Sequence, residues 1–279
     1  LQLRKSVEID DGLEVRKAQT WTEDKLWWWN RYIDITTGAL VGRNKWPYEL
    51  VYADLFAGPG ILEFESGERI PGSPLLAMHA AKPLSTVPLC EKNRARASVC
   101  EIRVQSVATT QSVQVFVGDC NEQIDAIAQQ IPEDSLTIAF VDPTGLHAHF
   151  KTIQTLASGR NVDLLILLAD WVDIIRNIET TYVNNPNSKL DKFLGPDSNW
   201  RTRWSGLADH NAAKVSKLFA SIYEDQLRKH LGYTVFADEV LRFRQGAPLY
   251  RVLFASKHKL GLKFWRESTK NERAGPRLF

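Results

Sequence analysis

Five carboxylates follow five short apolar runs along the chain, and they are the residues best placed to do chemistry. They are Asp54, Glu91, Asp119, Asp142 and Asp170, at intervals of 37, 28, 23 and 28 residues. Apolar runs stopped by turn signals are typical of buried strands, and these intervals suit strand–helix units around a parallel sheet. Charged residues often end strands without taking part in chemistry. Five in succession nevertheless favour a ligand site, because open α/β sheets bind ligands beyond the carboxyl ends of their strands.

The first of these runs leads into a glycine turn. Residues 50–60 read LVYADLFAGPG, in which Gly58-Pro59-Gly60 requires a tight turn that accepts only small or φ-restricted residues. Such a turn lets backbone N–H groups approach a ligand closely. The same pattern also occurs as an ordinary strand and turn, so alone it indicates a site only weakly.

Strand and helix patterns surround the carboxylates. Apolar residues at helical spacing predict a helix over 22–40 with Thr22 as its N-cap, and further helices between the apolar runs. Two late strand-like runs, 234–243 and 249–255, predict a C-terminal hairpin. We therefore predict an α/β, Rossmann-like fold. Its sheet is mostly parallel with one antiparallel strand from the hairpin, and helices cover both faces.

Residues 1–279 are predicted to form a single domain with three additions. A helical extension occupies about 1–46. An insertion at about 61–72 separates the glycine turn from a helix that begins at Ser73-Pro74, and it is either a flap over the site or a surface loop. A polar stretch rich in Pro, Asn and Gly, at about 176–210, is an insertion or a lid.

This architecture, with these residues in this order, resembles that of class I S-adenosylmethionine-dependent methyltransferases. DLFAGPG at 54–60 is similar to their first motif, in which the glycine turn packs against the methionine part of the cofactor. The resemblance implies that Glu91 binds the ribose hydroxyls and that Asp119, in VGDCN, accepts a hydrogen bond from the adenine amino group. The cofactor-binding residues expected on this basis are Asp54, Phe56, Gly58, Pro59, Gly60, Ser73, Glu91, Lys92, Asp119 and Cys120.

The motif after the fourth apolar run, VDPTGL, resembles the Asp-Pro-Pro-aromatic motif of methyltransferases that act on amino groups of nucleic acids. There a carboxylate and a backbone carbonyl orient an exocyclic amine toward the methyl group. The resemblance implies catalytic roles for Asp142 and Pro143. Thr144-Gly145 replace the second proline and the aromatic residue, which puts base stacking in doubt; alternatively Asp142 only caps the following turn. The substrate-binding residues expected are Thr144, Trp171, Arg201 and Arg203.

A closer resemblance covers nearly the whole chain. YADLFAGPG, PGSPLLAM, FVGDCNEQI, FVDPTGLH and LFASKHKLGLKFW are similar to segments of the three-Cys-motif partner protein family, TcmP. That family resembles divergent methyltransferases and is paired with a separate three-Cys-motif protein that resembles radical S-adenosylmethionine enzymes. The chain is therefore expected to be a methyltransferase for nucleic acid or a nucleobase-containing substrate. The alternative is a non-catalytic subunit that binds S-adenosylmethionine or a nucleotide and serves that partner.

Two segments are candidates for contact with a polyanion or a partner protein. The insertion carries Trp200, Trp204, Arg201 and Arg203, and Arg with Trp can grip phosphates and stack bases. Residues 251–279 contain eight Lys or Arg against two Glu. A solvated helix face or a docking surface accounts for these patterns equally well.

Other features exclude several classes of protein. No run of about 18 apolar residues predicts a membrane span, and the first ten residues lack an apolar signal core. Three widely spaced cysteines fit neither a disulfide framework nor a zinc site, so we predict a cytoplasmic protein in which Cys120 is a small buried side chain. His147 and His149 lack a third ligand nearby, and no metal site is predicted. A nicotinamide dehydrogenase is disfavoured because GxGxxG is absent after the first strand.

Overall fold

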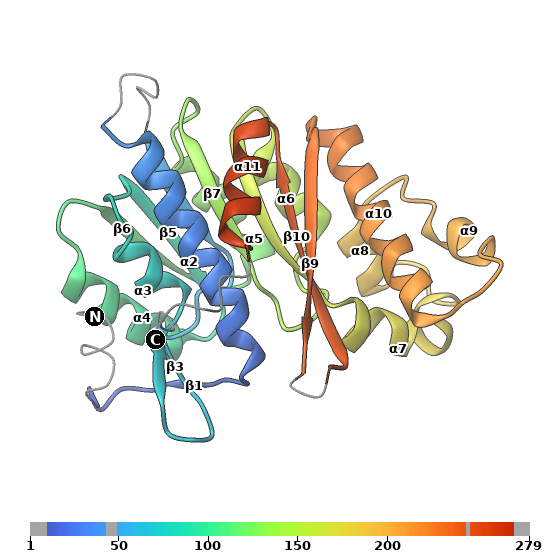
Figure 1. The fold of residues 1–279 in the computed structure, drawn as a ribbon, viewed down its shortest axis with the longest axis horizontal. Coiled ribbons are helices and arrows are strands. Elements are labelled where there is room, and N and C mark those ends of the chain that lie inside the picture. The colour runs from blue at the N-terminus through green and yellow to red at the C-terminus, as the bar shows by residue number, and fades with distance from the viewer. Residues whose placement is uncertain (1–9, 43–48, 244–245, 271–279) are drawn as a thin grey trace.

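A seven-stranded sheet forms the centre of the computed structural model, which describes residues 10–42, 49–243 and 246–270 (Figure 1). Its strand order is β6-β5-β2-β7-β8-β10-β9, and β10 runs in the direction opposite to the other six strands. This confirms the predicted fold class. The strands are β2 (Leu50–Asp54), β5 (Thr86–Glu91), β6 (Ser112–Val117), β7 (Leu136–Val141), β8 (Asn161–Leu168), β9 (Val235–Arg242) and β10 (Pro248–Ser256).

The strand β2 lies inside the sheet, between β5 and β7, and all five of its residues are buried. Its register places Asp54 beside Leu89 of β5 and Phe140 of β7. The parallel strands therefore end at one level, so the residues that follow β2, β5, β6 and β7 share one edge. Chain order changes direction at β2, with β5 on one side and β7 on the other, which is where such sheets form a crevice.

Helices cover both faces of the sheet (Figure 1). One face packs against α2 (Trp21–Leu40), α3 (Ser73–Met78), α4 (Arg94–Val107) and α11 (Lys259–Ser268). The other packs against α5 (Cys120–Gln129), α6 (Phe150–Ala157) and α10 (Ala212–Leu231). Side chains along β2 alternate between the two cores, with Tyr52 in the first and Val51 and Ala53 in the second, as the two-residue period of a strand requires.

The N-terminal extension contributes one long helix and one short strand. The helix α2 begins at Trp21 with Thr20 at the N-cap, so the predicted cap Thr22 lies inside the helix. Glu23 and Asp24 occupy its first turn, where negative charge favours the helix dipole. Trp29 is completely buried against Phe140, which anchors the helix to β7.

The insertion after the glycine turn is a hairpin and not an irregular loop. The strands β3 (Ile61–Glu63) and β4 (Arg69–Pro71) pair with each other, and β1 (Arg16–Lys17) adds to β3 in parallel. This second sheet ties the N-terminal segment to the glycine turn. The helix α3 then begins at Ser73 with Gly72 as its N-cap, one residue earlier than Ser73-Pro74 suggested.

The polar stretch predicted as an insertion or lid folds into short helices. They are α7 (Ile175–Asn177), η2 (Ile178–Tyr182), α8 (Lys189–Leu194) and α9 (Trp200–Ser205). A further short helix, η1 (Asp170–Ile174), precedes this stretch, and both η1 and η2 are π-helical. Ser188 and Asp191 cap α8 reciprocally, so polar side chains that indicated a loop define a helix start. Within the described ranges, no helix has the length and apolar character needed to cross a membrane.

Candidate cofactor and methyl-transfer site

Backbone hydrogen bonds to β5, β7 and Gly72 hold the glycine turn in place. Leu55 N donates to Phe140 O at 3.1 Å, and Ala57 N donates to Cys90 O at 2.9 Å, which ties the turn to β7 and β5. Gly60 O accepts from Gly72 N at 2.8 Å. Gly58 and Gly60 have φ of +65° and +90°, values that side chains disfavour, so this turn requires glycine. Backbone N–H groups are thus fixed at the edge of β2.

Asp54 supports this turn from beneath. Its Oδ1 accepts from Phe56 N and its Oδ2 from the Tyr52 hydroxyl, both at 2.9 Å. Burial raises the pKa of the Asp54 carboxyl to about 6, although hydrogen bonds from Ser73, Phe56 and Tyr52 oppose the rise. The side chain is completely buried and has no surface to offer a ligand. Asp54 thus supports the turn in this structure, and its predicted contact with the cofactor stays a prediction.

Glu91 is the carboxylate that faces the glycine turn. Its Oε2 accepts from Gly58 N at 3.0 Å and its Oε1 from Asn93 N at 2.8 Å. Each carboxylate oxygen can accept a second hydrogen bond, so the half-buried side chain still has one free acceptor site on each oxygen. Two acceptors fixed side by side suit a vicinal diol.

Asp119 follows β6, the next strand outward. It caps α5 through Asn121 N, which donates to its Oδ1 at 3.0 Å, and Lys92 Nζ lies 3.0 Å from its Oδ2. Burial acts to raise its pKa, but the hydrogen bonds from Asn121 and Lys92 outweigh it and hold the pKa below its usual value. Asp119 is therefore a negatively charged acceptor. Cys120 is buried beside it, and burial raises the pKa of its thiol to about 12, which fits a packing role.

Asn121 joins the ends of β6 and β7. Its Oδ1 accepts from His149 N at 2.9 Å and from the Thr152 hydroxyl at 2.6 Å, while its Nδ2 donates to His147 O at 2.8 Å. The loop after Asp142 is thus held against the start of α5. The described part of the chain holds no group of three or more His, Cys, Asp or Glu side chains arranged for a metal ion.

Asp142 at the end of β7 is ion-paired with a lysine. Lys25 Nζ, from α2, lies 2.5 Å from Asp142 Oδ2. The side chains of Lys25 and Asp142 are 5% and 16% exposed. Burial lowers the pKa of Lys25, and the charge of Asp142 partly restores it. One carboxylate oxygen of Asp142 is therefore engaged within the protein before any substrate arrives.

Aromatic rings flank this ion pair. Lys25 Nζ lies 5.2 Å from the centroid of the Trp21 ring, which packs on Tyr250 at 4.9 Å. The Tyr250 hydroxyl approaches Thr144 O at 3.5 Å. Burial raises the pKa of Tyr250, and the nearby charge of Asp142 adds to the effect. Thr144 is exposed and Pro143 is buried, so Thr144 has the more accessible side chain of the two.

The remaining substrate-binding candidates have structural partners. Arg201 donates to Asp191 and to three carbonyls, those of Val183, Tyr182 and Asn185. Its guanidinium therefore holds the insertion together, and its donors are already engaged. The predicted role of these side chains in substrate binding stays a prediction.

Arg203 also has structural partners, whereas Trp171 does not use its side-chain N–H. Arg203 pairs with Asp225 of α10 and donates to the Ser221 hydroxyl. Trp171 is the second residue of η1, shortly after β8, and its buried Nε1 has no partner in the described residues. A buried N–H without an acceptor is costly, so Trp171 is the candidate of these three with unused hydrogen-bonding capacity.

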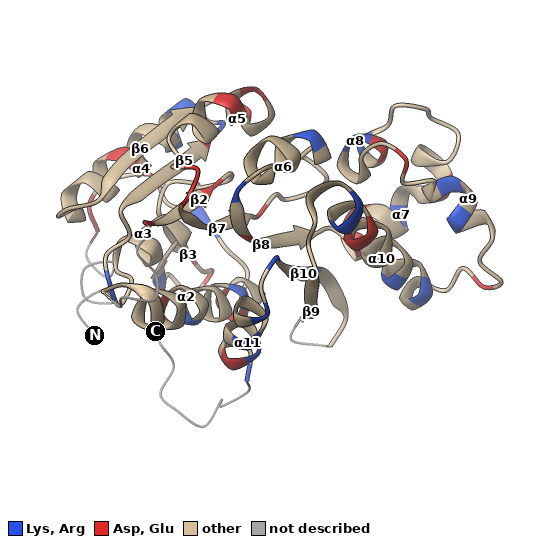
Figure 2. Cartoon of the chain, turned by 90° about the horizontal axis from the view of Figure 1, so that it is seen from above, with Lys and Arg blue, Asp and Glu red and all other residues tan. Residues whose placement is uncertain are grey.

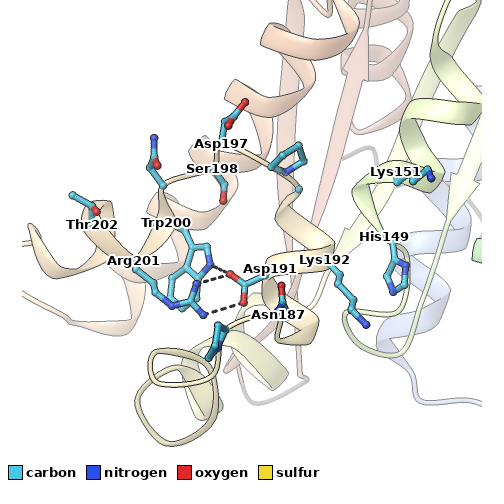
Figure 3. A pocket seen from close by; sticks show the side chains of 14 residues that line it. His149, Lys151, Asn187, Asp191, Lys192, Asp197, Ser198, Trp200, Arg201 and Thr202 are labelled. Carbon is cyan, nitrogen blue, oxygen red and sulfur yellow. Dashed lines mark hydrogen bonds and ion pairs between the residues drawn. The ribbon is translucent and has the colours of Figure 1, made fainter.

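A pocket of about 760 Å³ lies between the insertion and the start of α6 (Figure 3). Figure 3 shows the Arg201–Asp191 pair on one side and His149 with Lys192 on the other. Burial lowers the pKa of His149, and the charge of Lys192 lowers it further. Lys151 and Lys192 line the pocket without an ion-pair partner among the described residues, and Lys and Arg also mark α9 and α10 in Figure 2.

The backbone is unusual around the same pocket. Asn187, Asp197 and Asn199 line it, and they are the non-glycine residues with positive φ in the described chain. Asn and Asp tolerate this conformation best, and residues held in it concentrate at functional sites. The pocket is therefore a second candidate for ligand contact, adjacent to the end of β7 through His149.

Sequence reasoning missed three residues of the site: Lys25, Asn121 and Tyr250. The signal for Lys25 was its position on the face of α2 that carries Trp21 and Trp29, four residues before and after it, because a lysine on an apolar stripe requires a buried partner. Neither Asn121 nor Tyr250 stands out in the sequence, since both are brought to the site by packing.

The sequence matches no family model, and no curated protein matches it. The fold is similar to that of protein LPL1258 from Legionella pneumophila, of the family model DUF519, with a TM-score of 0.51 and 10% identity over 88% of each chain. Trm1 from Pyrococcus horikoshii with S-adenosyl-L-methionine gives a TM-score of 0.47 at 9% identity, over 90% of this chain and 58% of that chain. At these identities the likeness is one of fold.

An O-methyltransferase from Bacillus cereus in complex with SAH gives a TM-score of 0.43 at 10% identity, over 92% of this chain and 88% of that chain. The sheet order and the single antiparallel strand define this protein as a Rossmann-like α/β protein.

Proposed function

We propose that this chain is an S-adenosylmethionine-dependent methyltransferase that acts on an amino group of a nucleic acid or of a nucleobase-containing substrate. The observation that carries the proposal is the fixed position of Glu91, whose carboxylate is held by Gly58 N and Asn93 N at the crevice beside β2. Two free acceptor sites there match the two ribose hydroxyls of an adenosine.

The residues around Glu91 fit the rest of this cofactor. Asp119, one strand outward, is an ionised acceptor suited to an exocyclic amino group. Gly58, whose N–H binds Glu91, has no side chain, and the nearest atom to the position of its missing β-carbon is Arg16 Nη1 at 4.0 Å, so the methionine part would pass over the turn there. The cofactor would supply a methyl group on a sulfonium sulfur. Asp142, after β7 on the other side of β2, would hold the accepting amine with its free carboxylate oxygen.

The Lys25–Asp142 pair favours a second candidate function. A carboxylate neutralised by a buried ammonium is a weaker acceptor for an amine than a free one. The chain would then bind S-adenosylmethionine or a nucleotide without transferring the methyl group, as a subunit that serves the radical S-adenosylmethionine-like three-Cys-motif protein.

Calorimetry with S-adenosylmethionine and S-adenosylhomocysteine tests the cofactor. We expect binding by the wild-type chain, and a loss of about 1.5–3 kcal/mol in Glu91→Ala, the scale of hydrogen bonds to a charged group. Glu101→Ala, on an exposed position of α4, is the matched control and should bind as the wild type does. Failure of the wild-type chain to bind either compound would overturn the methyltransferase and would leave only the nucleotide-binding form of the second candidate.

Methyl transfer separates the two candidates. Labelled S-adenosylmethionine is incubated with RNA, DNA and nucleosides, with the chain alone and with the three-Cys-motif partner. Label in a nucleobase amino group supports the methyltransferase. Cofactor binding without label transfer under either condition favours the binding subunit.

A further inference from the structure

A strap formed by residues 10–18 crosses the glycine turn. Arg103 of α4, itself 5% exposed, fastens it: the guanidinium binds both carboxylate oxygens of Asp11 at 2.8 and 2.9 Å and Glu14 O at 2.9 Å. The same guanidinium donates to Pro59 O at 2.8 Å. One buried arginine therefore locks the strap and the glycine turn together, and β1 within the strap adds to β3.

The strap places Arg16 at the glycine turn. Arg16 Nη1 lies 4.0 Å from the position that a β-carbon would take on Gly58. The side chain is half-buried, and within the described residues it has no hydrogen-bond acceptor and no ion-pair partner. Other cations of this region are paired: Lys17 with Glu63, Arg69 with Asp10, and Arg96 with Glu14.

An unpaired guanidinium in a half-buried position is suited to an anion. Its planar donors match a carboxylate, which it can bind through two parallel hydrogen bonds. Two further cations lie near this space, and both are already paired: Lys25 with Asp142 and Arg103 with Asp11. The positive charge of Arg16 acts to lower the pKa of both Lys25 and Tyr250, so Arg16 lies near these side chains as well as near Gly58.

We propose that Arg16 binds the α-carboxylate of the methionine part of S-adenosylmethionine. This inference rests on the proposed cofactor, of which the amino-acid end is the anionic part. Glu91 would then bind the adenosine part of every such ligand, whereas Arg16 would contribute only to ligands that carry the carboxylate.

Two ligands that differ in this group provide the test. S-adenosylmethionine and its decarboxylated analogue share the adenosine, the sulfonium and the amine, and only the first has the carboxylate. We expect Arg16→Gln to weaken binding of S-adenosylmethionine by about 10–100-fold, the range of charged hydrogen bonds, and to leave affinity for the decarboxylated analogue unchanged. Arg16→Lys should retain part of the affinity. Lys17→Gln, one residue along the same strap, is the control and should behave as the wild type for both ligands.

Each other outcome has a distinct meaning. If the wild-type chain binds neither ligand, the cofactor itself is wrong and the inference falls with it. If the wild type binds S-adenosylmethionine and Arg16→Gln binds it equally well, Arg16 is not the carboxylate site and the proposed cofactor stands. An equal loss for both ligands makes Arg16 a support of the strap, which also overturns the inference. Melting curves without ligand should coincide for wild type and Arg16→Gln, because the described structure gives Arg16 no internal bond to lose.

Discussion

At the scale of single residues, the ion pair between Lys25 and Asp142 decides how the methyl-transfer end of the site can be tested. Lys25 is held by burial on an apolar helix face, and Asp142 is its counter-charge. Removing one partner of such a pair leaves an uncompensated buried charge, whereas replacing both by apolar or neutral groups is tolerated.

We therefore expect Asp142→Asn to lower the free energy of unfolding by about 3 kcal/mol. The double variant Lys25→Met/Asp142→Asn should recover most of that loss. Urea unfolding at neutral pH measures both. Equal stability of Asp142→Asn and wild type would mean that the pair does not form in solution. Methyl transfer without Asp142 should also be measured in the double variant, because the single variant leaves the buried Lys25 ammonium without a counter-charge.

Asp54 gives the protein a defined pH dependence. Its pKa is raised from 3.8 to about 6 because the carboxyl is buried. Between these values the folded state keeps a proton that the unfolded state releases, so the contribution of Asp54 to stability falls as pH rises from about 4 to 6. The change amounts to about 2–3 kcal/mol and levels off above the folded pKa.

The difference in unfolding free energy between wild type and Asp54→Asn isolates this effect from the other acids. Urea unfolding at pH 4, 5, 6 and 7 should show wild type losing stability relative to the variant up to about pH 6, with no further change above it. A constant difference, or one of opposite sign, would contradict a raised pKa for Asp54.

At the scale of elements, the strap and α4 form one unit with the glycine turn through Arg103. The side chain makes its hydrogen bonds in a position with almost no solvent, so its loss leaves the carbonyls of Pro59 and Glu14 without donors. We expect Arg103→Met to lower the free energy of unfolding by about 3 kcal/mol. It should also release the strap and speed trypsin cleavage after Arg16 and Lys17.

Arg96→Met is the matched control for that experiment. Arg96 lies on the same helix and binds the same strap through Glu14, but both side chains are about 40% exposed, at 39% and 41%. Surface pairs of this kind contribute about 0–1 kcal/mol. Cleavage of the strap at the wild-type rate in Arg103→Met would show that β1 and β3 hold it without the arginine.

At the scale of the whole molecule, charge is distributed unevenly between the cofactor edge and the insertion. The cofactor edge carries Glu91 and Asp119, whereas the pocket beside α6 carries Lys151 and Lys192. The basic segment predicted at residues 251–279 does not form one exposed surface within the described residues. Arg251 of β10 is buried with Asp170, and residues 271–279 lie outside the described chain. The pocket is thus the better-defined candidate surface for a polyanion.

If nucleic acid binds there, affinity should fall steeply with salt, because phosphate contacts release counterions. We expect Lys151→Glu/Lys192→Glu to weaken binding of a single-stranded oligonucleotide at least tenfold and to reduce the salt slope by about 1.5. Fluorescence anisotropy between 50 and 300 mM salt measures both quantities. Lys82→Glu, exposed before β5 at the opposite edge of the sheet, should have no effect. Binding that does not depend on salt would instead favour a protein partner at this surface.

Local sequence patterns were sufficient to predict most strands of the sheet and the glycine turn. Apolar runs and the turn signals after them predicted β2, β5, β6, β7, β8 and the C-terminal hairpin, because strand formation and chain reversal depend on neighbouring residues. The carboxylates at the strand ends share an edge because parallel strands leave no other place for them. The glycine turn was readable for the same reason: only glycine accepts the backbone angles of Gly58 and Gly60.

Tertiary structure alone decided which of these groups are free to act. Asp142 meets Lys25 across 117 residues and Arg103 meets Asp11 across 92, contacts that arise only when α2 and the strap dock on the sheet. Packing between these elements also buries Asp54. The guanidinium of Arg201 donates its hydrogen bonds to carbonyls of its own insertion and is therefore not free for a ligand. The sequence shows which charged residues exist, and their spacing predicts the element that carries each one. Which ion-pair partner each charged side chain meets, and whether it remains free to bind a ligand, depends on packing between elements that are distant in sequence. Arg16 is an example, because its guanidinium lies unpaired within the described residues beside the glycine turn.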